Sequence, residues 1–498
     1  MTLREMVEIL PGARLVAGDP SLVIHRVTHD SRQAGPGCLF VGIPGLKQNG
    51  AAYAAGALAS GAAAVAVEAG TAPLPNAPWI EVGDARGALS LLASRLNGSP
   101  TNRLVLVGIT GTNGKSTTAF LVREILKAAG KKTALVGTIR YEIGDETLPA
   151  PHTTPEAPAL HEHFAKAVAA GCDAAVMEVS SHALSLRRAD DCAFDVGVFT
   201  NLTQDHLDFH PDLASYRDAK RRLFEIVARK GKGPRAAVVN AEDAASHEIA
   251  APVRDAGLPV LRFGAAPECE LRAIGVRLAT DGASFELAGP GFRVPVTLRM
   301  PAAHNVENAL AAAGAGVALQ IAPETIARGL SALTAVPGRF ERVPTDNGVD
   351  VVVDYAHTPD ALQRTLAAAR QVWRKKLIVV FGCGGDRDRG KRPQMGSIAG
   401  KMSDLAIVTS DNPRSEAPEA ICAEVAAGAK ASGGTYEVVV DRKEAIQRAL
   451  ARAAPGDLVL IAGKGHEDYQ ILRDRTIPFS DASVVREIAG ASRKEPVR

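Results

Sequence analysis

Two segments of the chain carry residue types suited to chemistry on a nucleotide and on an amino acid. Residues 111–117 read Gly-Thr-Asn-Gly-Lys-Ser-Thr, and residues 411–414 read Asp-Asn-Pro-Arg. The first segment follows an apolar run and precedes a helical pattern, which is the strand–loop–helix context of a phosphate-binding loop. A chain that holds a nucleotide at one site and selects an amine at the other could use ATP to join two molecules. The residues expected to contact ATP phosphates are Gly111, Thr112, Asn113, Gly114, Lys115, Ser116 and Thr117.

Each part of this loop has a physical role. The glycines let backbone N–H groups close on phosphate oxygens, Lys115 adds positive charge, and Ser116 offers a hydroxyl to Mg²⁺. The spacing departs from the strict Walker pattern, because Gly108 lies one position too far upstream and Ile109 occupies the expected place. A chance glycine-rich turn is the alternative, but the flanking pattern favours a phosphate loop. The departure argues against an ordinary motor ATPase or GTPase.

Further polar clusters lie at or near the ends of predicted strands, where open α/β sheets bind their ligands. Glu178 and His206 could complete a metal shell beside Ser116, since carboxylates suit Mg²⁺ well and histidine does so less usually. Four clusters follow strands of one predicted C-terminal sheet, so we expect a pocket for a zwitterion at its edge rather than a solvated charged face. The clusters are residues 152–155, 177–182 and 200–208, then 354–359, 381–391, 411–414 and 463–467.

The chain of 498 residues is long enough for about three domains. We predict an α/β protein with an N-terminal α/β domain at 1–98, a central P-loop-like parallel-sheet domain at 99–332 and a C-terminal Rossmann-like domain at 333–498. Strand–helix units should repeat from Leu104 to about residue 330. Predicted strands are Thr133–Thr138, Ala174–Val179, Val196–Thr200 and Ala236–Val239, then Val349–Asp354, Lys376–Phe381, Leu405–Thr409, Glu437–Val440 and Leu458–Ile461.

Composition excludes several classes of partner. The net charge of +2 gives no broad field for nucleic acid or a membrane surface. The six cysteines show neither a CxxC pair nor zinc spacing, so we expect buried thiols in a reducing cytosol. Residues 1–8 contain acids and do not resemble a signal peptide, and Ala51–Val67 is typical of a helix followed by a strand. We therefore expect a cytoplasmic, monomeric protein.

Taken together, these motifs resemble those of the Mur ligases of peptidoglycan synthesis, and in particular their diaminopimelate-adding members. The resemblance covers the whole chain, with the motifs in the family's order. The matching segments are the phosphate loop, Glu-Val-Ser-Ser-His at 178–182, Asn-Leu-Thr-Gln-Asp-His-Leu-Asp at 201–208, His-Asn-Val-Glu-Asn at 304–308, Pro-Gly-Arg-Phe at 337–340, Asp-Tyr-Ala-His at 354–357 and Gly-Lys-Gly-His-Glu at 463–467.

The resemblance implies that the N-terminal domain binds the UDP part of UDP-N-acetylmuramoyl-L-alanyl-D-glutamate, through Ser31 and the loop at 46–48. That loop reads Leu-Lys-Gln, whereas a His-Gln-Ala-type run is more usual, and Leu186 stands where glutamine is frequent. Further substrate contacts are implied for His152, Thr153, Thr154, Ser180, Leu186 and Arg188.

Taken alone, Lys220 reads as a solvated lysine; the resemblance implies that it carries a carbamate (N6-carboxylysine). Ser116, Glu178, His206 and the modified Lys220 would then hold Mg²⁺. Asn305, Arg339 and Asp354 would contact ATP. The implied catalytic residues are Lys115, Glu178, His206, Lys220 and Arg339.

In the family, ATP phosphorylates the γ-carboxylate of D-glutamate, and the amine of meso-2,6-diaminopimelate attacks the acyl phosphate. The distal carboxylate, which lysine lacks, suits the planar fork of Arg414; Arg387 would take another carboxylate and Glu467 an ammonium. The implied amino-acid site comprises Arg387, Asp411, Asn412, Pro413, Arg414, Gly463 and Glu467.

Three alternatives compete with this hypothesis. Arg414 argues against a lysine-adding ligase. The N-terminal domain argues against a folylpolyglutamate synthetase relative, which lacks a UDP-binding module. The presence of Lys115, Glu178, His206 and Lys220 argues against a non-catalytic nucleotide-binding regulator.

Overall fold

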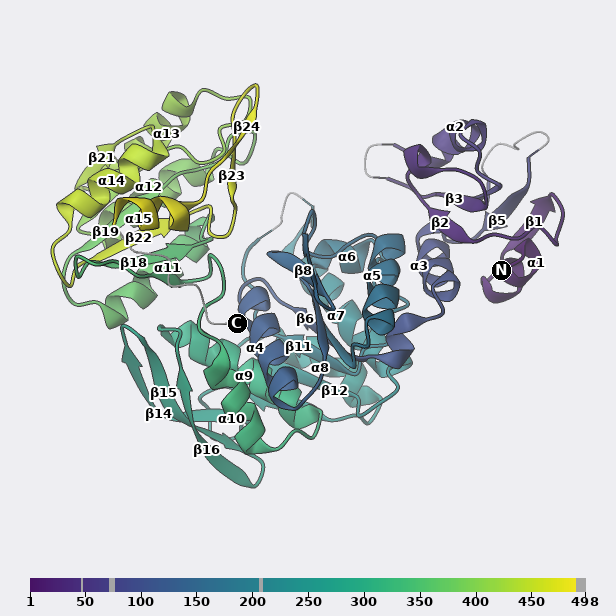
Figure 1. Ribbon diagram of the computed structural model, residues 1–498, viewed down its shortest axis with the longest axis horizontal. Helices are drawn as coiled ribbons and strands as arrows, with labels where there is room; N and C mark the ends of the chain where they lie inside the picture. Colours follow the sequence, from purple (N-terminus) through teal and green to yellow (C-terminus); the bar gives the residue numbers. More distant parts are fainter. Residues whose placement is uncertain (46–47, 71–76, 206–208, 490–498) are drawn as a thin grey trace. The chain divides into compact units, whose positions relative to one another are not determined.

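The computed structural model describes residues 1–45, 48–70, 77–205 and 209–489. These residues form two compact units (Figure 1). The first consists of Met1–Glu270 and Ala311–Ile326, and the second of Leu271–Leu310 with the described residues from Ala327 onward.

The first unit begins with a five-stranded sheet in the order β1-β5-β4-β3-β2, in which all pairs are parallel except β1 with β5. Helix α3 packs on this sheet, and Asp84 caps its first turn by accepting the N–H of Gly87. The elements are α1 (Leu3–Ile9), β1 (Arg14–Ala17), β2 (Arg26–Thr28), η1 (Ser31–Gln33), β3 (Cys38–Gly42), η2 (Gly50–Tyr53), α2 (Ala54–Ala59), β4 (Ala64–Glu68), β5 (Trp79–Val82), α3 (Ala85–Leu96) and η3 (Pro100–Arg103).

The first unit also contains an eight-stranded sheet, in the order β13-β12-β11-β6-β10-β7-β8-β9. It is parallel from β13 to β7, and the hairpin β8–β9 adds an antiparallel edge. Its elements are β6 (Val105–Thr110), α4 (Lys115–Ala128), β7 (Thr133–Val136), β8 (Arg140–Ile143), β9 (Glu146–Pro149), α5 (Ala157–Ala169), β10 (Ala174–Glu178), α6 (Ser181–Ser185), β11 (Val196–Phe199), α7 (Leu213–Lys230), β12 (Ala236–Asn240), α8 (Ser246–Asp255) and β13 (Val260–Phe263).

Helices α5, α7 and α8 share one hydrophobic core with this sheet, which contains Phe164, Phe224 and Ile249. The four central strands β11, β6, β10 and β7 run parallel, so their carboxyl ends lie at one edge. The four strands predicted between residues 133 and 239 are confirmed. The carboxyl edge therefore collects the loops that follow Thr110, Val136, Glu178 and Phe199.

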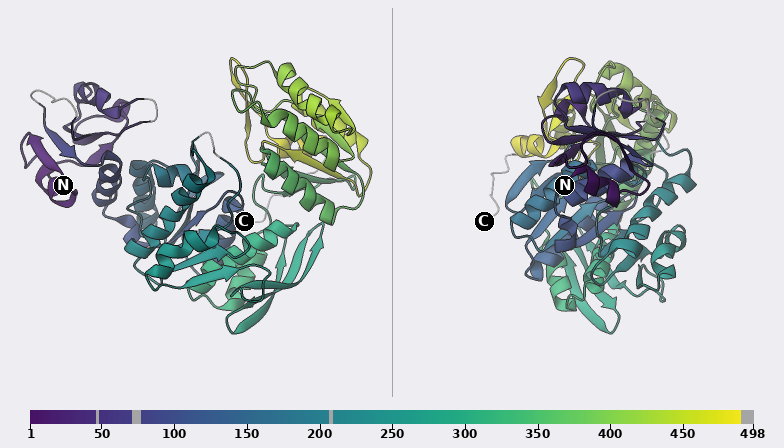
Figure 2. Two further views of the ribbon diagram at one scale, coloured as in Figure 1. Left: turned by 180° about the vertical axis from the view of Figure 1, so that it is seen from behind. Right: turned by 90° about the vertical axis from the view of Figure 1, so that its right-hand side faces the viewer.

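The prediction of continuous strand–helix units up to residue 330 is wrong for residues 272–298, which form an antiparallel sheet in the second unit (Figure 2). In β16 buried and less buried positions alternate, as expected where one sheet face is solvated. The elements are β14 (Arg272–Ala279), β15 (Gly282–Gly289), β16 (Phe292–Leu298), and the helices α9 (Ala303–Ala318) and α10 (Pro323–Ala332), which the division into units cuts.

The second unit also contains a six-stranded sheet in the order β17-β18-β22-β19-β20-β21, parallel except at β17. Helices α11, α12 and α13 cover one face, and α14 and α15 cover the other. The elements are β17 (Glu341–Val343), β18 (Asp350–Asp354), α11 (Pro359–Val372), β19 (Leu377–Phe381), α12 (Lys391–Met402), β20 (Leu405–Val408), α13 (Pro418–Ala431), β21 (Tyr436–Val438), α14 (Arg442–Arg452), β22 (Leu458–Ala462), β23 (Tyr469–Ile471), β24 (Thr476–Pro478) and α15 (Asp481–Ile488).

The five predicted C-terminal strands are confirmed as β18, β19, β20, β21 and β22. Four of them, β18, β22, β19 and β20, are adjacent and parallel, so the clusters that follow them meet at one edge of the sheet. The predicted convergence of these four clusters is therefore confirmed at the level of strand topology.

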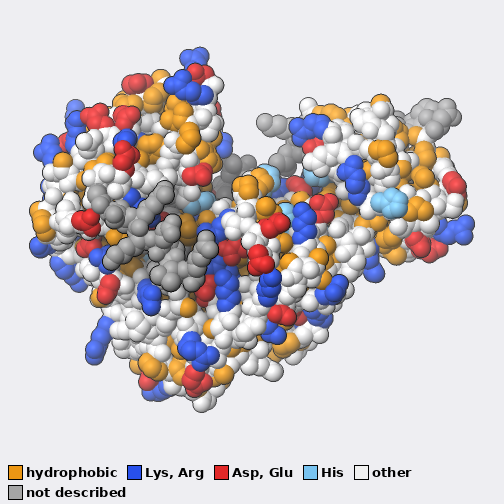
Figure 3. Space-filling view, viewed as in Figure 1, with side chains coloured by type: hydrophobic (Ala, Val, Ile, Leu, Met, Phe, Trp, Pro, Cys, Tyr) orange, Lys and Arg blue, Asp and Glu red, His pale blue; other side chains and the backbone are white. Residues whose placement is uncertain are grey.

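The distribution of surface charge and the state of the cysteines can be compared with what the composition predicts. Acidic and basic side chains are intermixed over the face shown in Figure 3. All six cysteines are buried and unpaired, and burial raises the pKa of Cys422 to about 11. Within the described ranges, no helix has both the length and the apolar character needed to cross a membrane.

Candidate functional site

The phosphate loop connects β6 to α4 and packs closely against the loop after β11. Gly111 has φ +150°, and a Cβ there would lie 1.9 Å from Thr200 Oγ1. The Thr112 N–H donates to the Asn201 carbonyl over 2.8 Å, and the Asn113 N–H donates to Asn201 Oδ1 over 2.9 Å. Position 111 therefore requires glycine for two reasons: its positive φ, and the close approach of Thr200, which leaves no room for a Cβ.

Two lysines converge on this loop. Lys115 Nζ donates to the carbonyls of Gly111 and Thr112 over 3.0 and 2.8 Å. Lys220, on α7, is 1% exposed, and its Nζ donates to the Gly111 carbonyl over 2.8 Å. The same nitrogen lies 4.1 Å from the ring centroid of Tyr216. Burial, reinforced by the nearby Lys115 charge, lowers the pKa of Lys220 well below its ordinary value.

Glu178 ends β10 beside the first turn of α4 and is 1% exposed. Its Oε2 accepts the Ser116 hydroxyl over 3.0 Å and the Thr138 hydroxyl over 2.9 Å. Its Oε1 accepts the Thr138 N–H over 2.8 Å. Among the described residues no group of three His, Cys, Asp or Glu side chains could hold a metal ion. His206, the fourth predicted ligand, lies outside the described residues.

Four of the residues predicted to contact the muramoyl-dipeptide form one network. Thr154 Oγ1 donates to the Glu178 carbonyl over 2.8 Å and accepts the Ser180 N–H over 3.1 Å. Arg188 Nη1 donates to the Thr154 carbonyl over 3.0 Å, and Arg188 Nη2 pairs with Glu156. Thr153 Oγ1 lies 3.0 Å from Thr138 Oγ1. This network is continuous with the Glu178 carboxylate.

The other predicted contacts of this substrate are less closely connected. The His152 carbonyl accepts the Tyr141 hydroxyl over 2.5 Å, and Tyr141 is not part of the Thr154 network described above. Ser31 lies in η1, and no hydrogen bond among the described residues links it to the Thr154 network. Leu186 ends α6 with a backbone bond to His182. In the predicted loop at 46–48, Leu46 and Lys47 lie outside the described residues.

The second unit carries the remaining predicted ATP contacts. Asn305 is 1% exposed, and its Nδ2 donates to the Pro301 carbonyl over 2.7 Å. Asp354 accepts the N–H groups of Phe340 and Ala356 over 2.7 and 3.0 Å, and the Thr365 hydroxyl over 3.1 Å.

Arg339 lies with its Cζ 4.6 Å from the Tyr355 ring centroid. Burial raises the pKa of Tyr355 to about 12, so this ring keeps its proton at neutral pH.

The predicted amino-acid site brings three loops together. Asn412 Nδ2 donates to Glu467 Oε2 over 2.9 Å. Lys464, which is 0% exposed, donates to Asn412 Oδ1 over 3.2 Å and to Glu467 Oε2 over 3.1 Å. Asp411 is held by Gln470, whose Nε2 donates to its carbonyl over 2.6 Å. A Cβ at Gly463 would lie 2.7 Å from Asp411 Oδ2.

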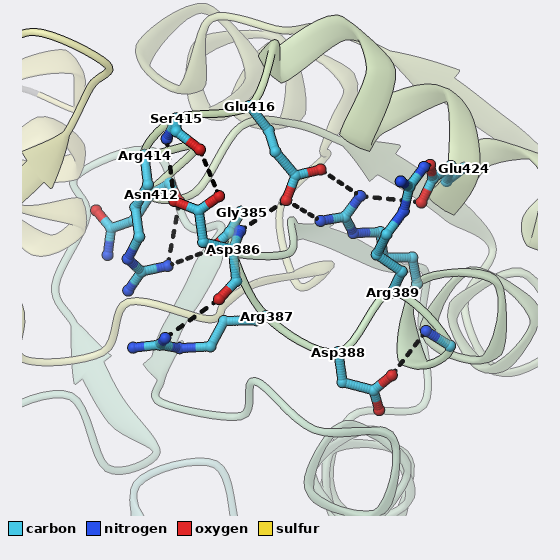
Figure 4. A network of polar contacts seen from close by, with 12 residues as sticks. Gly385, Asp386, Arg387, Asp388, Arg389, Asn412, Arg414, Ser415, Glu416 and Glu424 are labelled. Atoms are coloured by element: carbon cyan, nitrogen blue, oxygen red, sulfur yellow. Dashed lines mark hydrogen bonds and ion pairs between the residues drawn. The ribbon is translucent and has the colours of Figure 1, made fainter. Parts of the chain in front are cut away.

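Arg414 and Arg387 belong to this arrangement from two different loops (Figure 4). Arg414 Nη1 donates to the Gly385 carbonyl over 2.8 Å and to the Asn412 carbonyl over 3.4 Å. Arg387 is exposed, and its Nη1 donates to the Asp386 carbonyl over 3.2 Å. Within the described part of the chain neither guanidinium pairs with a carboxylate, so both can receive an anionic group.

Sequence reasoning missed several residues that support these sites. Thr138 donates two hydrogen bonds to Glu178, but a threonine at the end of a predicted strand carries no sequence signal for such a role. Buried Arg442 donates to the carbonyls of Ser410 and Ala462 and pairs with Asp481. Lys464 lies inside the Gly-Lys-Gly-His-Glu motif, but its burial results from tertiary packing and could not be predicted from that motif.

Family models match three parts of the chain. The "Mur ligase family, catalytic domain" model matches residues 23–96, the "Mur ligase middle domain" model 109–316, and the "Mur ligase, glutamate ligase domain" model 338–465.

The chain is 44% identical to a UDP-N-acetylmuramoyl-L-alanyl-D-glutamate–2,6-diaminopimelate ligase of Geobacter metallireducens over 99% of both chains. It is 45% identical to the ligase of the same name from Solibacter usitatus over 98% of both. A solved structure of a ligase with that name superposes with a TM-score of 0.72 at 31% identity over 99% of both chains. A folylpolyglutamate synthase of Mycobacterium tuberculosis shares the fold, with a TM-score of 0.62 at 19% identity over 80% of this chain and 94% of that one.

Proposed function

The chain belongs to the Mur ligase family, and on that premise we propose that it joins meso-2,6-diaminopimelate to UDP-N-acetylmuramoyl-L-alanyl-D-glutamate in an ATP-dependent reaction. The new amide forms at the γ-carboxylate of D-glutamate. The observation that carries this proposal is the likeness to diaminopimelate ligases at 44% and 45% identity along 98–99% of the chain. The 19% identity to a folylpolyglutamate synthase extends only to the fold.

Arg414 supports the choice of amino acid. Its Nη1 is held by two carbonyls, which leaves the rest of the guanidinium fork for a carboxylate. Glu467 is held by Asn412 and Lys464 and supplies the negative charge for an ammonium group. A ligand with a distal carboxylate and an ammonium, as in diaminopimelate, therefore fits these charges better than lysine does.

ATP has to activate a poor electrophile, the carboxylate of the acceptor. The γ-phosphoryl group passes to the carboxylate, the amine then attacks the acyl carbon, and phosphate leaves. Positioning and charge neutralisation supply most of the rate in such transfers. We assign the phosphate contacts to the loop from Gly111 to Thr117, with Lys115 and Arg339 neutralising the transferred group and Asn305 and Asp354 contacting the nucleoside.

Lys220 is suited to become a carbamate because burial favours its neutral amine. The ammonium first loses one proton to give the neutral amine, which attacks CO₂. An N–C bond forms and the nitrogen loses a second proton, so the side chain ends as an anionic oxygen ligand. The lysine already lies against the phosphate loop through its 2.8 Å bond to the Gly111 carbonyl. The modified side chain would carry a negative charge that attracts Lys115.

Ser116 and Glu178 fit a magnesium ion, since both present oxygen atoms within 3.0 Å of each other at the start of α4. Together with His206 and the modified Lys220 they would hold it, and a bound Mg²⁺ would offset phosphate charge during transfer. Thr138 keeps the Glu178 carboxylate oriented through two hydrogen bonds.

The acceptor substrate would be held by Ser31, His152, Thr153, Thr154, Ser180 and Arg188, with Leu186 nearby. Because the reaction uses ATP and a UDP-linked precursor, we infer a cytoplasmic enzyme. Its action as a monomer stays a prediction.

The test is ATP-dependent phosphate release from the purified protein with each substrate omitted in turn. We expect release only when both the UDP-muramoyl-dipeptide and meso-diaminopimelate are present, with a product whose mass equals their sum minus water. Release that ignores the amino acid would contradict the proposal.

A further inference from the structure

Two loops carry the guanidinium groups assigned to the amino acid, and their backbones are in direct contact. The Arg387 loop (residues 382–390) follows β19, and the Arg414 loop (residues 411–416) follows β20. The Gly385 N–H donates to the Asn412 carbonyl over 2.9 Å. A Cβ at Gly385 would lie 1.9 Å from the Pro413 carbonyl oxygen. Neither loop can therefore shift far without moving the other.

A single peptide group, between Gly385 and Asp386, joins Arg414 to Glu416 (Figure 4). Its carbonyl accepts Arg414 Nη1 over 2.8 Å. Its N–H donates to Glu416 Oε1 over 2.6 Å. The orientation of this peptide group therefore determines where its carbonyl can hold the Arg414 guanidinium. Glu416 fixes that orientation by accepting the N–H of the same peptide group.

Glu416 is itself fixed from inside the domain. Arg392, on α12, is 0% exposed and donates to both carboxylate oxygens of Glu416, over 2.7 and 2.9 Å. A two-bond pairing of a guanidinium with a carboxylate adds geometric specificity to the ion pair. The Arg392 guanidinium, with the Asp386 N–H, lowers the pKa of the Glu416 carboxyl to about 2, so the carboxylate is charged at neutral pH.

The backbone at both guanidinium loops is strained, which makes the supporting bonds necessary. Asp386 and Arg414 each have φ +53°, a left-handed conformation that non-glycine residues rarely adopt. Besides the peptide at residues 385–386, Ser415 links the loops by donating through its N–H and hydroxyl to the Asp386 carboxylate over 3.2 and 2.5 Å. Such strain persists only where surrounding contacts impose it.

We propose that Glu416 is a positioning residue for the amino-acid substrate: it transmits the fixed position of Arg392 through the Gly385–Asp386 peptide to the guanidinium of Arg414. The inference rests on the proposed function, because it assigns Arg414 and Arg387 to the two carboxylates of the diamino diacid. Glu416 contacts no substrate in this scheme. It sets the distance between the two guanidinium groups, and hence the preference for a diacid over lysine.

The test compares Glu416→Ala with Glu424→Ala. Both remove one carboxylate from Arg392, since Glu424 Oε2 accepts Arg392 Nη1 over 2.9 Å. Glu424 otherwise pairs with Arg389, whose side chain is 69% exposed, and no hydrogen bond among the described residues joins it to the Gly385–Asp386 peptide. Each purified variant is assayed for the KM of diaminopimelate, the KM of ATP and kcat.

For Glu416→Ala we expect the KM of diaminopimelate to rise on the order of tenfold, with the KM of ATP unchanged within about twofold. Selectivity against lysine should fall in the same variant. Glu424→Ala should keep both KM values. Equal behaviour of the two variants, or a joint rise of both KM values after Glu416→Ala, would overturn the inference.

Two milder variants keep the test decisive if Glu416→Ala does not fold. Glu416→Gln retains an acceptor for the Asp386 N–H, so its KM for diaminopimelate should lie between those of wild type and Glu416→Ala. Ser415→Ala removes one exposed link between the loops and should raise the same KM by a smaller factor. Wild-type values in both variants would reject the positioning role. A wild-type protein inactive with diaminopimelate would instead refute the proposed function.

Discussion

Lys220 Nζ donates to the Gly111 carbonyl over 2.8 Å, across 109 residues of sequence. This bond brings a buried lysine of α7 against the phosphate loop of β6 and α4. An unmodified lysine in that place is either a costly buried cation or a neutral amine. The depressed pKa of Lys220, caused first by burial, favours the neutral amine that reacts with CO₂.

Replacing Lys220 by alanine should abolish ligase activity, because the proposed carbamate would supply an oxygen ligand that alanine lacks. Added formate or acetate should restore part of the rate by occupying the space of the lost carbamate. The measurement is phosphate release at saturating substrates with and without the short carboxylate. Arg221→Ala, on the same helix but 42% exposed, is the control and should retain activity. Full activity of the unrescued Lys220→Ala enzyme would refute the carbamate assignment.

Gly111→Ala should raise the KM of ATP on the order of tenfold or more, because the new Cβ would lie 1.9 Å from Thr200 Oγ1 and the loop would have to move. Gly130→Ala provides the matched control. Gly130 also has a positive φ, of +78°, but a Cβ there would meet no described residue within 4 Å beyond its chain neighbours. That control should lose stability while its KM for ATP stays near wild type. Similar KM values for both variants would show that the close approach at Gly111 is not needed.

Arg414→Lys should raise the KM of diaminopimelate far more than the KM of ATP. Lysine cannot both donate to the Gly385 carbonyl and grip a carboxylate with two parallel bonds. Initial rates measured while each substrate is varied in turn give the two KM values. An equal rise in the two KM values would show that Arg414 does not bind the distal carboxylate of diaminopimelate.

His161 should make the stability of the first unit sensitive to acid. It is 0% exposed on α5, neither ring nitrogen has a hydrogen-bond partner among the described residues, and burial lowers its pKa from 6.5 to about 4. The unfolded chain therefore binds more protons between these values, and stability falls as pH drops from 6.5 toward 4.

The check compares urea unfolding of wild type and His161→Phe at pH about 7.5 and 5.5. Wild type should lose about 1 kcal/mol more than the variant over this interval. Parallel losses in the two proteins would mean that His161 is protonated in the folded state or does not titrate in this range.

Much of the fold could be predicted because buried parallel strands read as continuous apolar runs. Leu405–Val408 and Leu458–Ala462 are such strands, and both were predicted to within a residue or two. The sheet of β14, β15 and β16 was missed because its three consecutive strands interrupt the strand–helix pattern, and because β16 alternates buried and less buried positions instead of forming a continuous apolar run. The hairpin β8–β9 was also missed, although its two-residue Gly144-Asp145 connection is a hairpin signal.

The candidate sites were predictable where a motif follows a strand. Glu178 beside Ser116, and Asn412 beside Glu467, were grouped from strand order alone, and the structure places each pair within 3.0 Å. The supporting residues were not predictable. Arg392 and Thr138 act through contacts with distant segments, so no local pattern distinguishes them from ordinary surface or strand residues.

The most direct measurement of the central claim is the kcat/KM for meso-diaminopimelate, lysine and ornithine with one enzyme preparation. Binding a substrate without the distal carboxylate leaves Arg414 unpaired, which costs on the order of 2–5 kcal/mol once the site is desolvated. We therefore predict a preference for diaminopimelate over lysine of at least about thirtyfold, with ornithine no better than lysine. A lysine kcat/KM equal to that of diaminopimelate would contradict the account.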